Sequence, residues 1–206
     1  MIKNTNFILK SKLPLILASK SASRKKILRE TGLSFIQMGS NVDEEEIKKK
    51  YNKISFTKLA KKLAEQKALS ISKVSKNNYV IGADQICVNR KKVFNKPKTK
   101  NKALEQLNIL NGKTHEQISA VCLCYNSKVI WSYTETAKMK MRQLPMSTLK
   151  TYVELDLPLN SCGSYKFESM GKYLFTKVEG NTNTILGLPI FPLLNILIKN
   201  QIITYV

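Results

Sequence analysis

The chain has 206 residues, a length that suits one ordinary domain, or one domain with two lobes, around a sizeable core. Hydrophobic residues make up 43% of it, and its formal net charge is +21. No apolar run approaches the roughly 20 residues of a membrane span, and residues 1–12 are too polar for a signal peptide. We therefore expect a cytoplasmic protein.

The high positive charge raises the question of nucleic-acid binding, because a cationic surface attracts phosphate backbones. Only four of the 35 basic residues are arginine, however, and the lysines are spread along the whole chain. Base recognition relies on the forked guanidinium group of arginine. We therefore do not expect nucleic acid as the partner, and a basic nucleic-acid binder is the third-ranked interpretation.

The cysteines have neither the spacing nor the companions of a metal site. No CxxC pair occurs, and His115 is the only histidine, so a zinc ligand set cannot be completed. A lone histidine at the start of a strand is more often structural than catalytic. We expect buried free thiols at Cys87, Cys122, Cys124 and Cys162.

The first predicted elements are a buried strand over Leu15–Ala18 and a helix over Ala22–Thr31, which Gly32 ends. A turn rich in serine and basic residues joins them. A helix start offers unpaired N–H groups and a positive dipole end, which suits a phosphate. The same pattern also fits an ordinary serine cap followed by a solvated basic face. The glycines of a Walker loop are missing.

The rest of the chain alternates between helices and strands. The pattern predicts strands at 35–38, 79–84, 118–125, 129–141 and 173–178, and helices at 56–74, 100–110, 147–155 and 189–198. The strands at 118–125 and 129–141 are expected to be antiparallel, because only three residues separate them. This order indicates one α/β domain with a mixed sheet over residues 1–206, with residues 1–12 as a loosely ordered extension.

Polar residues gather at the ends of these elements, where active sites are usually built. Carboxylates and cations together suit metal-assisted phosphoryl chemistry, in which oxygen ligands hold Mg²⁺ or Mn²⁺ and a carboxylate accepts a proton from water. Asp84 is predicted to close an apolar strand, where open α/β sheets bind ligands. The acidic run Asp43–Glu46 fits either a ligand set or a solvated turn.

Several segments in register resemble one family. The matching segments are Leu17-Ala18-Ser19-x-Ser21 with Arg24, Val42-Asp43-Glu44, Glu65-x-Lys67-Ala68, Ile81-Gly82-Ala83-Asp84-Gln85, Lys96-Pro97, Asn111-Gly112-Lys113-Thr114-His115 and Gly187-Leu188-Pro189. In this order they resemble the Maf family over nearly the whole chain.

The resemblance implies a nucleoside triphosphate pyrophosphatase, which cleaves between the α and β phosphates to give a monophosphate and pyrophosphate. It also implies an elongated, two-lobed α/β fold with a mixed sheet and a central cleft, related to that of the inosine triphosphate pyrophosphatases. The family uses a divalent cation, Mg²⁺ or Mn²⁺, and its substrates include dTTP, UTP and modified nucleotides such as 7-methylguanosine triphosphate.

The resemblance also implies roles for individual residues. Asp84 matches the family's proton acceptor, and Glu44, together with Asp84, matches its metal-associated carboxylates. The triphosphate-binding positions are matched by Ser19, Arg24, Lys25, Lys67 and Lys96. The positions that select the base are matched by Ser23, Gln85 and Glu168.

The chain departs from the family pattern at a few positions. Ala22 stands where proline is usual, Lys25 where arginine is usual, and Asn95 where glycine is usual. Gln85 and Glu168 resemble the 7-methylguanosine triphosphate branch, whereas Ser23 matches neither branch, so the preferred base stays open. The alternative function is a regulatory protein of cell division and septum formation that acts by binding. The sequence also leaves a homodimer open.

Overall fold

The computed structural model describes residues 8–206, and the chain forms two compact units. Unit 1 contains the chain up to Asp84 together with Ala120–Thr134 and Gly187–Val206. Unit 2 contains Gln85–Ser119 and Glu135–Leu186. Each unit is therefore built from segments that are distant in the sequence.

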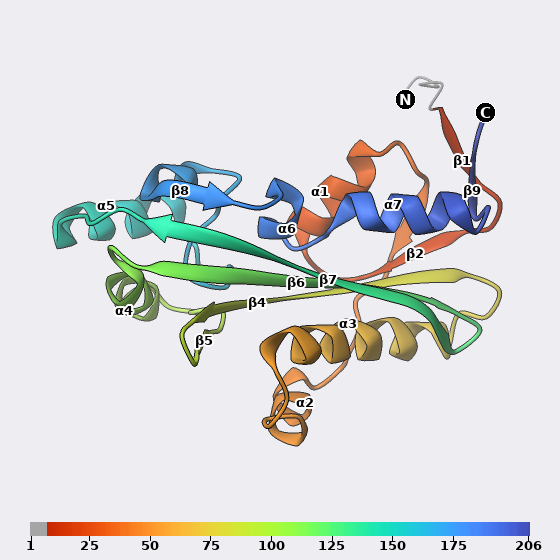
Figure 1. Cartoon of the computed structure of the whole chain (residues 1–206), viewed down its shortest axis with the longest axis horizontal. Coiled ribbons are helices and arrows are strands. Elements are labelled where there is room, and N and C mark those ends of the chain that lie inside the picture. Colours follow the sequence, from red (N-terminus) through yellow and green to blue (C-terminus); the bar gives the residue numbers. More distant parts are fainter. Residues whose placement is uncertain (1–7) are drawn as a thin grey trace. The chain divides into compact units, whose positions relative to one another are not determined.

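Unit 1 holds the N-terminal and C-terminal elements. They are β1 (Leu9–Ser11), β2 (Leu15–Ala18), α1 (Ala22–Glu30), β3 (Phe35–Gln37), α2 (Glu44–Lys50), α3 (Phe56–Ser72), the first part of β4 (Tyr79–Asn89), α7 (Ile190–Lys199) and β9 (Ile203–Tyr205). Strand β2 pairs in parallel with both β3 and β4. Figure 1 shows α3 on one side of these strands and α1 and α7 on the other.

A glycine sets how closely α3 approaches the sheet. A Cβ atom at Gly82 on β4 would lie 2.3 Å from the carbonyl oxygen of Ala64 and 2.7 Å from the amide nitrogen of Ala68. The helix therefore packs backbone against backbone at this point, which no other residue type allows without a shift. Lys67 on the helix and Asp84 on the strand both lie next to this contact.

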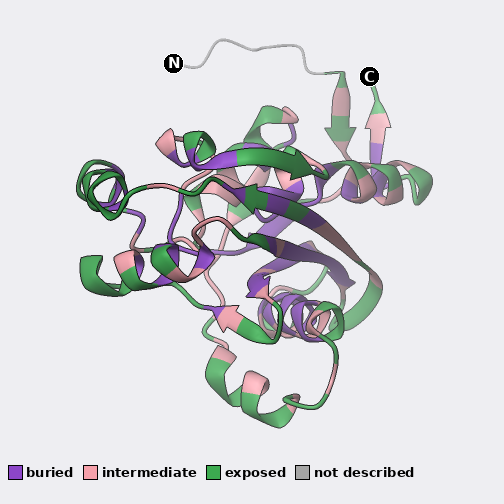
Figure 2. Ribbon diagram, turned by 60° about the vertical axis from the view of Figure 1, so that its left-hand side comes forward, coloured by how far each residue is buried: buried purple, intermediate pink, exposed green. Residues whose placement is uncertain are grey.

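Burial follows the expected pattern. The buried positions lie mainly on the strands and on the inner faces of the helices (Figure 2). On α3 they include Leu59, Leu63 and Ile71, which recur at the spacing of one helical face. Among the helices of residues 8–206, none has the length and apolar character needed to cross a bilayer.

Unit 2 holds the remaining elements. They are the rest of β4, β5 (Lys92–Phe94), α4 (Lys100–Leu110), parts of β6 (Thr114–Tyr125) and β7 (Lys128–Met141), α5 (Met146–Asp156), the 3₁₀ helix η1 (Met170–Leu174), β8 (Phe175–Glu179) and α6 (Thr182–Ile185). Helices α4 and α5 contact each other and share one core with β7, η1 and β8. Strand β5 pairs antiparallel with β4, and β8 pairs antiparallel with β7.

The expected mixed α/β fold is confirmed. Hydrogen bonding joins the strands in the order β3-β2-β4-β6-β7-β8, with β5 added to β4, and β1 and β9 form a separate antiparallel pair. Asn126 and Ser127 connect β6 to β7 with φ values of 46° and 62°. A two-residue loop with two positive φ values is the turn of a tight hairpin, so the expected antiparallel arrangement of these two strands is supported.

Several sequence expectations were wrong in detail. Asp84 does not close its strand, because β4 continues through apolar residues to Asn89. Residues 170–174 are a 3₁₀ helix, so the last predicted strand begins at Phe175 instead of Tyr173. Helix α2 was not predicted at all. Of the expected N-terminal extension, Leu9–Ser11 form β1, and residues 1–7 lie outside the described residues.

The four cysteines are free, as expected. Cys87, Cys122 and Cys124 are buried, and Cys162 is partly exposed. Burial raises the pKa of the Cys87 thiol well above its usual value. The sulfur atoms of Cys122 and Cys124 lie 3.8 Å apart on one face of β6. The three buried thiols are part of the core, which agrees with a structural role. The expectation of burial was wrong for Cys162, which is only partly buried.

His115 is part of a buried polar group in unit 2. Its Nε2 atom lies 2.8 Å from the hydroxyl of Tyr165, and Gln117 donates to the same hydroxyl at 2.7 Å. The Nδ1 atom has no hydrogen-bond partner among residues 8–206. Burial lowers the pKa of His115 to about 4. The neutral ring therefore packs with Tyr165 and Phe175, which supports a structural role for this histidine.

This buried histidine predicts a pH-dependent stability. The pKa of His115 is about 4 in the fold, against about 6.5 in an unfolded chain, so its contribution is complete above pH 6.5 and is lost as the pH falls towards 4. Between pH 7.5 and pH 5 we expect a loss of about 2 kcal/mol in the free energy of unfolding. Urea unfolding of the wild type and of His115→Gln isolates this contribution. An equal pH dependence in both proteins would contradict it.

Candidate active site

The turn between β2 and α1 is organised around Ser19. Its side chain is 5% exposed, and its hydroxyl accepts hydrogen bonds from the Ser21 amide at 3.2 Å and from Arg24 Nη1 at 3.3 Å. Ser21 caps α1, because its hydroxyl accepts from the Arg24 amide at 3.4 Å. The expectation of a serine cap is thus confirmed. Ser19 has a different role in the same turn, because its hydroxyl binds the Arg24 side chain.

Long-range hydrogen bonds hold this turn and its arginine. Arg24 Nε donates to the carbonyl oxygen of Gly187 at 2.8 Å, from a residue 163 positions away. Gln37, the last residue of β3, donates its side-chain amide to the carbonyl oxygen of Ser19 at 2.8 Å. Gln37 was not predicted as a site residue, and Gly187 was named only within the Gly187-Leu188-Pro189 segment. Arg24 thus uses its Nε and Nη1 groups to fix its position in the turn.

The start of α1 has the electrostatic character of an anion site. Its first turn contains no acidic residue, and Ser23, Arg24 and Lys25 lie in it, each partly buried. The first N–H groups of a helix lack partners within the helix and carry the positive end of the dipole. Together with the fixed guanidinium of Arg24, they form a place where phosphate oxygens could bind.

The acidic run Asp43–Glu46, which fitted either a ligand set or a solvated turn, forms the start of helix α2. Asp43 caps the helix by accepting from the amides of Glu45 and Glu46, both at 3.0 Å. Glu45 pairs with Lys48 at 2.7 Å on the surface. Three acids in the first turn and three lysines in the last complement the helix dipole, and no residue of α2 is buried. Asp43 and Glu45 therefore have structural roles in this helix.

Glu44, Lys67 and Asp84 form an ion cluster inside unit 1. Lys67 Nζ lies 2.7 Å from Glu44 Oε1 and 2.5 Å from Asp84 Oδ1. Lys67 and Asp84 are 8% and 4% exposed, so this is a largely buried pair. A sequence signal for it exists, because Lys67 lies four residues from both Leu63 and Ile71 and so interrupts the apolar face of α3.

A second buried carboxylate on α3 had no predicted role. Glu65 accepts from Lys62 at 2.9 Å and from the hydroxyl of Ser132 at 3.4 Å. The bond from Ser132 connects α3 to β7 two residues before Lys67. Glu65 therefore helps to fix the helix from which Lys67 extends, and no signal in the sequence identified Ser132 as its partner.

Three expected site residues belong to unit 2. Gln85 is partly buried, and its side-chain amide donates to the carbonyl oxygens of Thr184 and Ile185 at 3.3 and 2.6 Å. Lys96 is exposed and follows Asn95, whose carbonyl oxygen accepts from Gln106 at 2.9 Å. Glu168 is exposed and lies just before η1.

The donor set of unit 1 fits a divalent cation. Among residues 8–206 there is no cluster of three or more His, Cys, Asp or Glu side chains suited to a metal. Glu44 and Asp84 nevertheless direct one oxygen each at the same nitrogen atom. Mg²⁺ commonly uses one or two carboxylates and completes its shell with waters and substrate phosphates. Two converging carboxylates meet that requirement.

Comparison with known proteins gives a consistent result. The profile of the family described as Maf-like protein matches residues 14–200. A nucleoside triphosphate pyrophosphatase of Legionella pneumophila is 42% identical over 190 residues, which cover 92% of this chain and 95% of that protein. One of Pelagibacter ubique is 40% identical over 180 residues, covering 85% and 92%.

Among solved structures, the Ham1 protein of Staphylococcus aureus aligns with 91% of this chain and 99% of its own, at 11% identity and a TM-score of 0.43. The family assignment rests on the profile match and on the relatives at 40% identity and above. The chain belongs to the Maf family.

Proposed function

We propose that this protein is a nucleoside triphosphate pyrophosphatase that hydrolyses the bond between the α and β phosphates. The observation that carries the proposal is the ion cluster in which the buried Lys67 contacts both Glu44 and the buried Asp84. The basic, acid-free first turn of α1 supports it. The names of relatives that cover most of the chain support the same activity.

In this proposal the triphosphate is bound by cations and by the helix start. Arg24 offers its outer Nη2 edge, Ser19 keeps that arginine in place, and Lys25 adds a charge from the same turn. Lys67 is the cation closest to the two carboxylates. For Lys96 the role rests on the family resemblance and on its exposed ammonium group. Charge-assisted hydrogen bonds of this kind are about twice as strong as neutral ones.

Asp84 is the proposed general base. Its Oδ1 atom is paired with Lys67 at 2.5 Å, and this ion pair holds the carboxylate in position. In the proposal the other carboxylate oxygen, Oδ2, accepts the proton of an attacking water. Placement on the rigid strand β4 fixes where that proton acceptor lies.

Glu44 and Asp84 are the proposed metal ligands. A bound Mg²⁺ or Mn²⁺ supplies charge neutralisation to the phosphate oxygens. Glu44 enters the cluster from the first residue of α2, whose cap and dipole fix its backbone. Asp84 enters it from β4, so the two ligands come from separate rigid elements.

Base selection is proposed to involve Ser23, Gln85 and Glu168. Both amide hydrogens of Gln85 are used by backbone carbonyls, which leaves its Oε1 atom as an acceptor. Glu168 offers carboxylate acceptors as well. Acceptors suit the N–H edge of guanine and the positive charge of a 7-methylated guanine, whereas thymine and uracil present a single ring N–H. We therefore propose 7-methylguanosine triphosphate before dTTP and UTP.

The Glu168 role leads to a test of substrate ranking. Glu168→Gln keeps the shape of the side chain and removes its charge. It should change the ratio of kcat/KM between purine and pyrimidine triphosphates, by an amount that corresponds to about 1 to 3 kcal/mol of discrimination free energy. Metal dependence should stay the same. Glu179→Gln, at an exposed carboxylate on β8, is the matched control. An unchanged ranking of substrates would show that Glu168 does not select the base.

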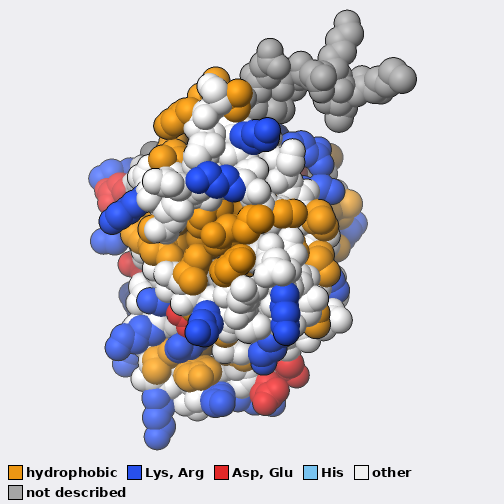
Figure 3. All heavy atoms as spheres, turned by 90° about the vertical axis from the view of Figure 1, so that its right-hand side faces the viewer, with side chains coloured by type: hydrophobic (Ala, Val, Ile, Leu, Met, Phe, Trp, Pro, Cys, Tyr) orange, Lys and Arg blue, Asp and Glu red, His pale blue; other side chains and the backbone are white. Residues whose placement is uncertain are grey.

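The face shown in Figure 3 does not have the charge pattern of a nucleic-acid binder. On the face shown in Figure 3, lysine and arginine side chains are scattered around a group of hydrophobic side chains and do not form a continuous stripe. Proteins that track a phosphate backbone usually gather their positive charge along one groove or face. The lysines behind the net charge of +21 are likewise spread along the whole chain.

The proposed activity is tested by incubating the protein with a panel of nucleoside triphosphates and Mg²⁺ or Mn²⁺ while pyrophosphate is detected. We expect metal-dependent pyrophosphate release from at least one member of the panel. A properly folded protein that releases no pyrophosphate from any of them would overturn the proposal.

A further inference from the structure

The ammonium group of Lys67 occupies the point where two carboxylates meet. Its nitrogen lies within hydrogen-bond distance of Glu44 Oε1, at 2.7 Å, and of Asp84 Oδ1, at 2.5 Å. The side chains of Lys67 and Asp84 are only 10% and 6% exposed. All three residues belong to unit 1. Any cation held by both oxygens must therefore use the place that Lys67 now fills.

A divalent cation and this ammonium group exclude each other. Mg²⁺ lies about 2 Å from its oxygen ligands, so a cation bound by the same two oxygens would overlap the position of the lysine nitrogen. Like charges at such a distance also repel strongly where water is largely excluded. The two carboxylates can hold the metal or the lysine, but they cannot hold both in this arrangement.

We propose that Lys67 is a resident cation that a divalent metal must displace, so that metal entry and the release of Lys67 are one exchange. This inference rests on the proposed function, in which Glu44 and Asp84 are metal ligands. A metal–triphosphate complex supplies a new partner for each group in the exchange. Its cation binds the two carboxylates, and its phosphate oxygens bind the displaced ammonium group of Lys67. The flexible four-carbon stem of lysine permits that movement.

The exchange has a consequence for selectivity. A free divalent cation offers no phosphate to the displaced lysine, so its binding leaves Lys67 without a counter-charge. Free metal should therefore bind weakly, and the metal–nucleotide complex should bind well. Lys67 would in this way select the complex over the free metal.

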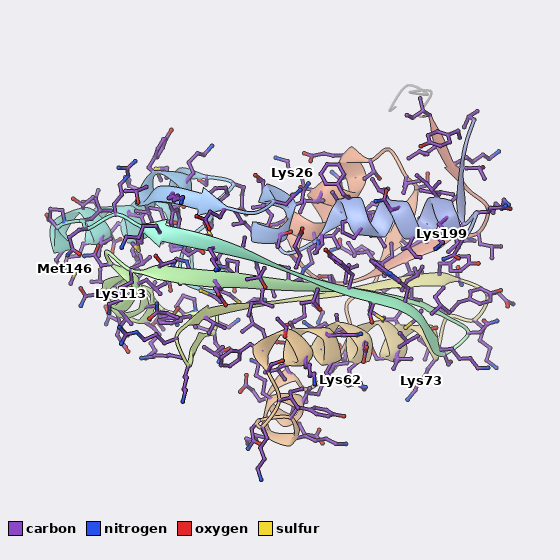
Figure 4. All side chains as sticks on the ribbon, viewed as in Figure 1. Lys26, Lys62, Lys73, Lys113, Met146 and Lys199 are labelled. Carbon is purple, nitrogen blue, oxygen red and sulfur yellow. The ribbon has the colours of Figure 1, made fainter. Side chains whose placement is uncertain are left out.

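The test measures Mn²⁺ binding without nucleotide, by the electron paramagnetic resonance signal of free Mn²⁺. Lys67→Met should bind Mn²⁺ more tightly than the wild type by about tenfold or more, which corresponds to about 1.4 kcal/mol. The matched control is Lys62→Met, which removes another lysine of α3 that is ion-paired to a buried carboxylate (Figure 4). The control should bind Mn²⁺ as the wild type does.

Further variants separate the outcomes. Adding Glu44→Gln to Lys67→Met should abolish the gain, and a gain that survives would place the metal elsewhere and overturn the proposal. Equal or weaker Mn²⁺ binding by Lys67→Met would overturn it as well, while pyrophosphate release by the wild type would leave the proposed function standing. No pyrophosphate release by the wild type would reject that function separately.

A measurement on the wild type covers the case in which Lys67→Met does not fold. Acetylation of individual lysines is followed by mass spectrometry with and without Mn²⁺. Displacement predicts that Mn²⁺ raises the acetylation rate of Lys67 and leaves that of Lys62 unchanged. A Lys67 rate that does not change at saturating Mn²⁺ would contradict the exchange.

Discussion

Replacing Asp84 by asparagine is expected to lower kcat by about 100-fold or more while the protein stays folded. The amide keeps the shape of the side chain and an oxygen that can accept from Lys67 Nζ, but it cannot take a proton from water. The pairing at 2.5 Å places this carboxylate in the buried cluster, so the loss should not depend on the base of the substrate. Steady-state kinetics with two different triphosphates measure both points.

The control for this variant is Glu45→Gln, which neutralises an exposed carboxylate one residue after Glu44. It should retain activity close to that of the wild type. Circular dichroism and thermal unfolding show whether each variant is folded. Near-normal turnover by a folded Asp84→Asn protein would exclude Asp84 as the general base.

The second large effect is expected at Arg24. Arg24→Met keeps much of the side-chain volume but removes the guanidinium, which lies between Ser19 and the carbonyl oxygen of Gly187. Loss of a charge-assisted contact to phosphate should lower kcat/KM. The corresponding loss of transition-state stabilisation is about 1.5 to 3 kcal/mol, mostly seen as a higher KM. The effect should be the same for every base.

Arg29→Met is the matched control, because Arg29 lies on the last turn of the same helix and is exposed. It removes the same charge at the other end of α1. If both variants lost activity equally, overall charge rather than the Ser19 turn would explain substrate binding.

Much of the fold could be predicted where local signals agree. The strand Leu15–Ala18 and the helix Lys100–Leu110 have the predicted boundaries, because apolar spacing, capping residues and turn residues all point to the same limits. Helix α2 could not be predicted from apolar spacing. It has no buried face, and its Asp43 cap and complementary charges take the place of burial.

The site was harder to predict than the fold, since it depends on contacts across the sequence. Sequence reasoning ended β4 at Asp84, because a carboxylate within a buried strand normally carries a large cost. Lys67 offsets that cost, and the strand continues to Asn89. Glu44 could not be distinguished from its acidic neighbours by sequence, because its contact with Lys67 joins residues that are distant in the chain.

The most direct measurement of the central claim is the identity of the products. The protein is incubated with each triphosphate and Mg²⁺ or Mn²⁺, and the products are separated by anion-exchange chromatography. Cleavage between the α and β phosphates predicts equal amounts of nucleoside monophosphate and pyrophosphate, and their loss in Asp84→Asn. Nucleoside diphosphate with inorganic phosphate, or product formation that Asp84→Asn leaves intact, would contradict the account.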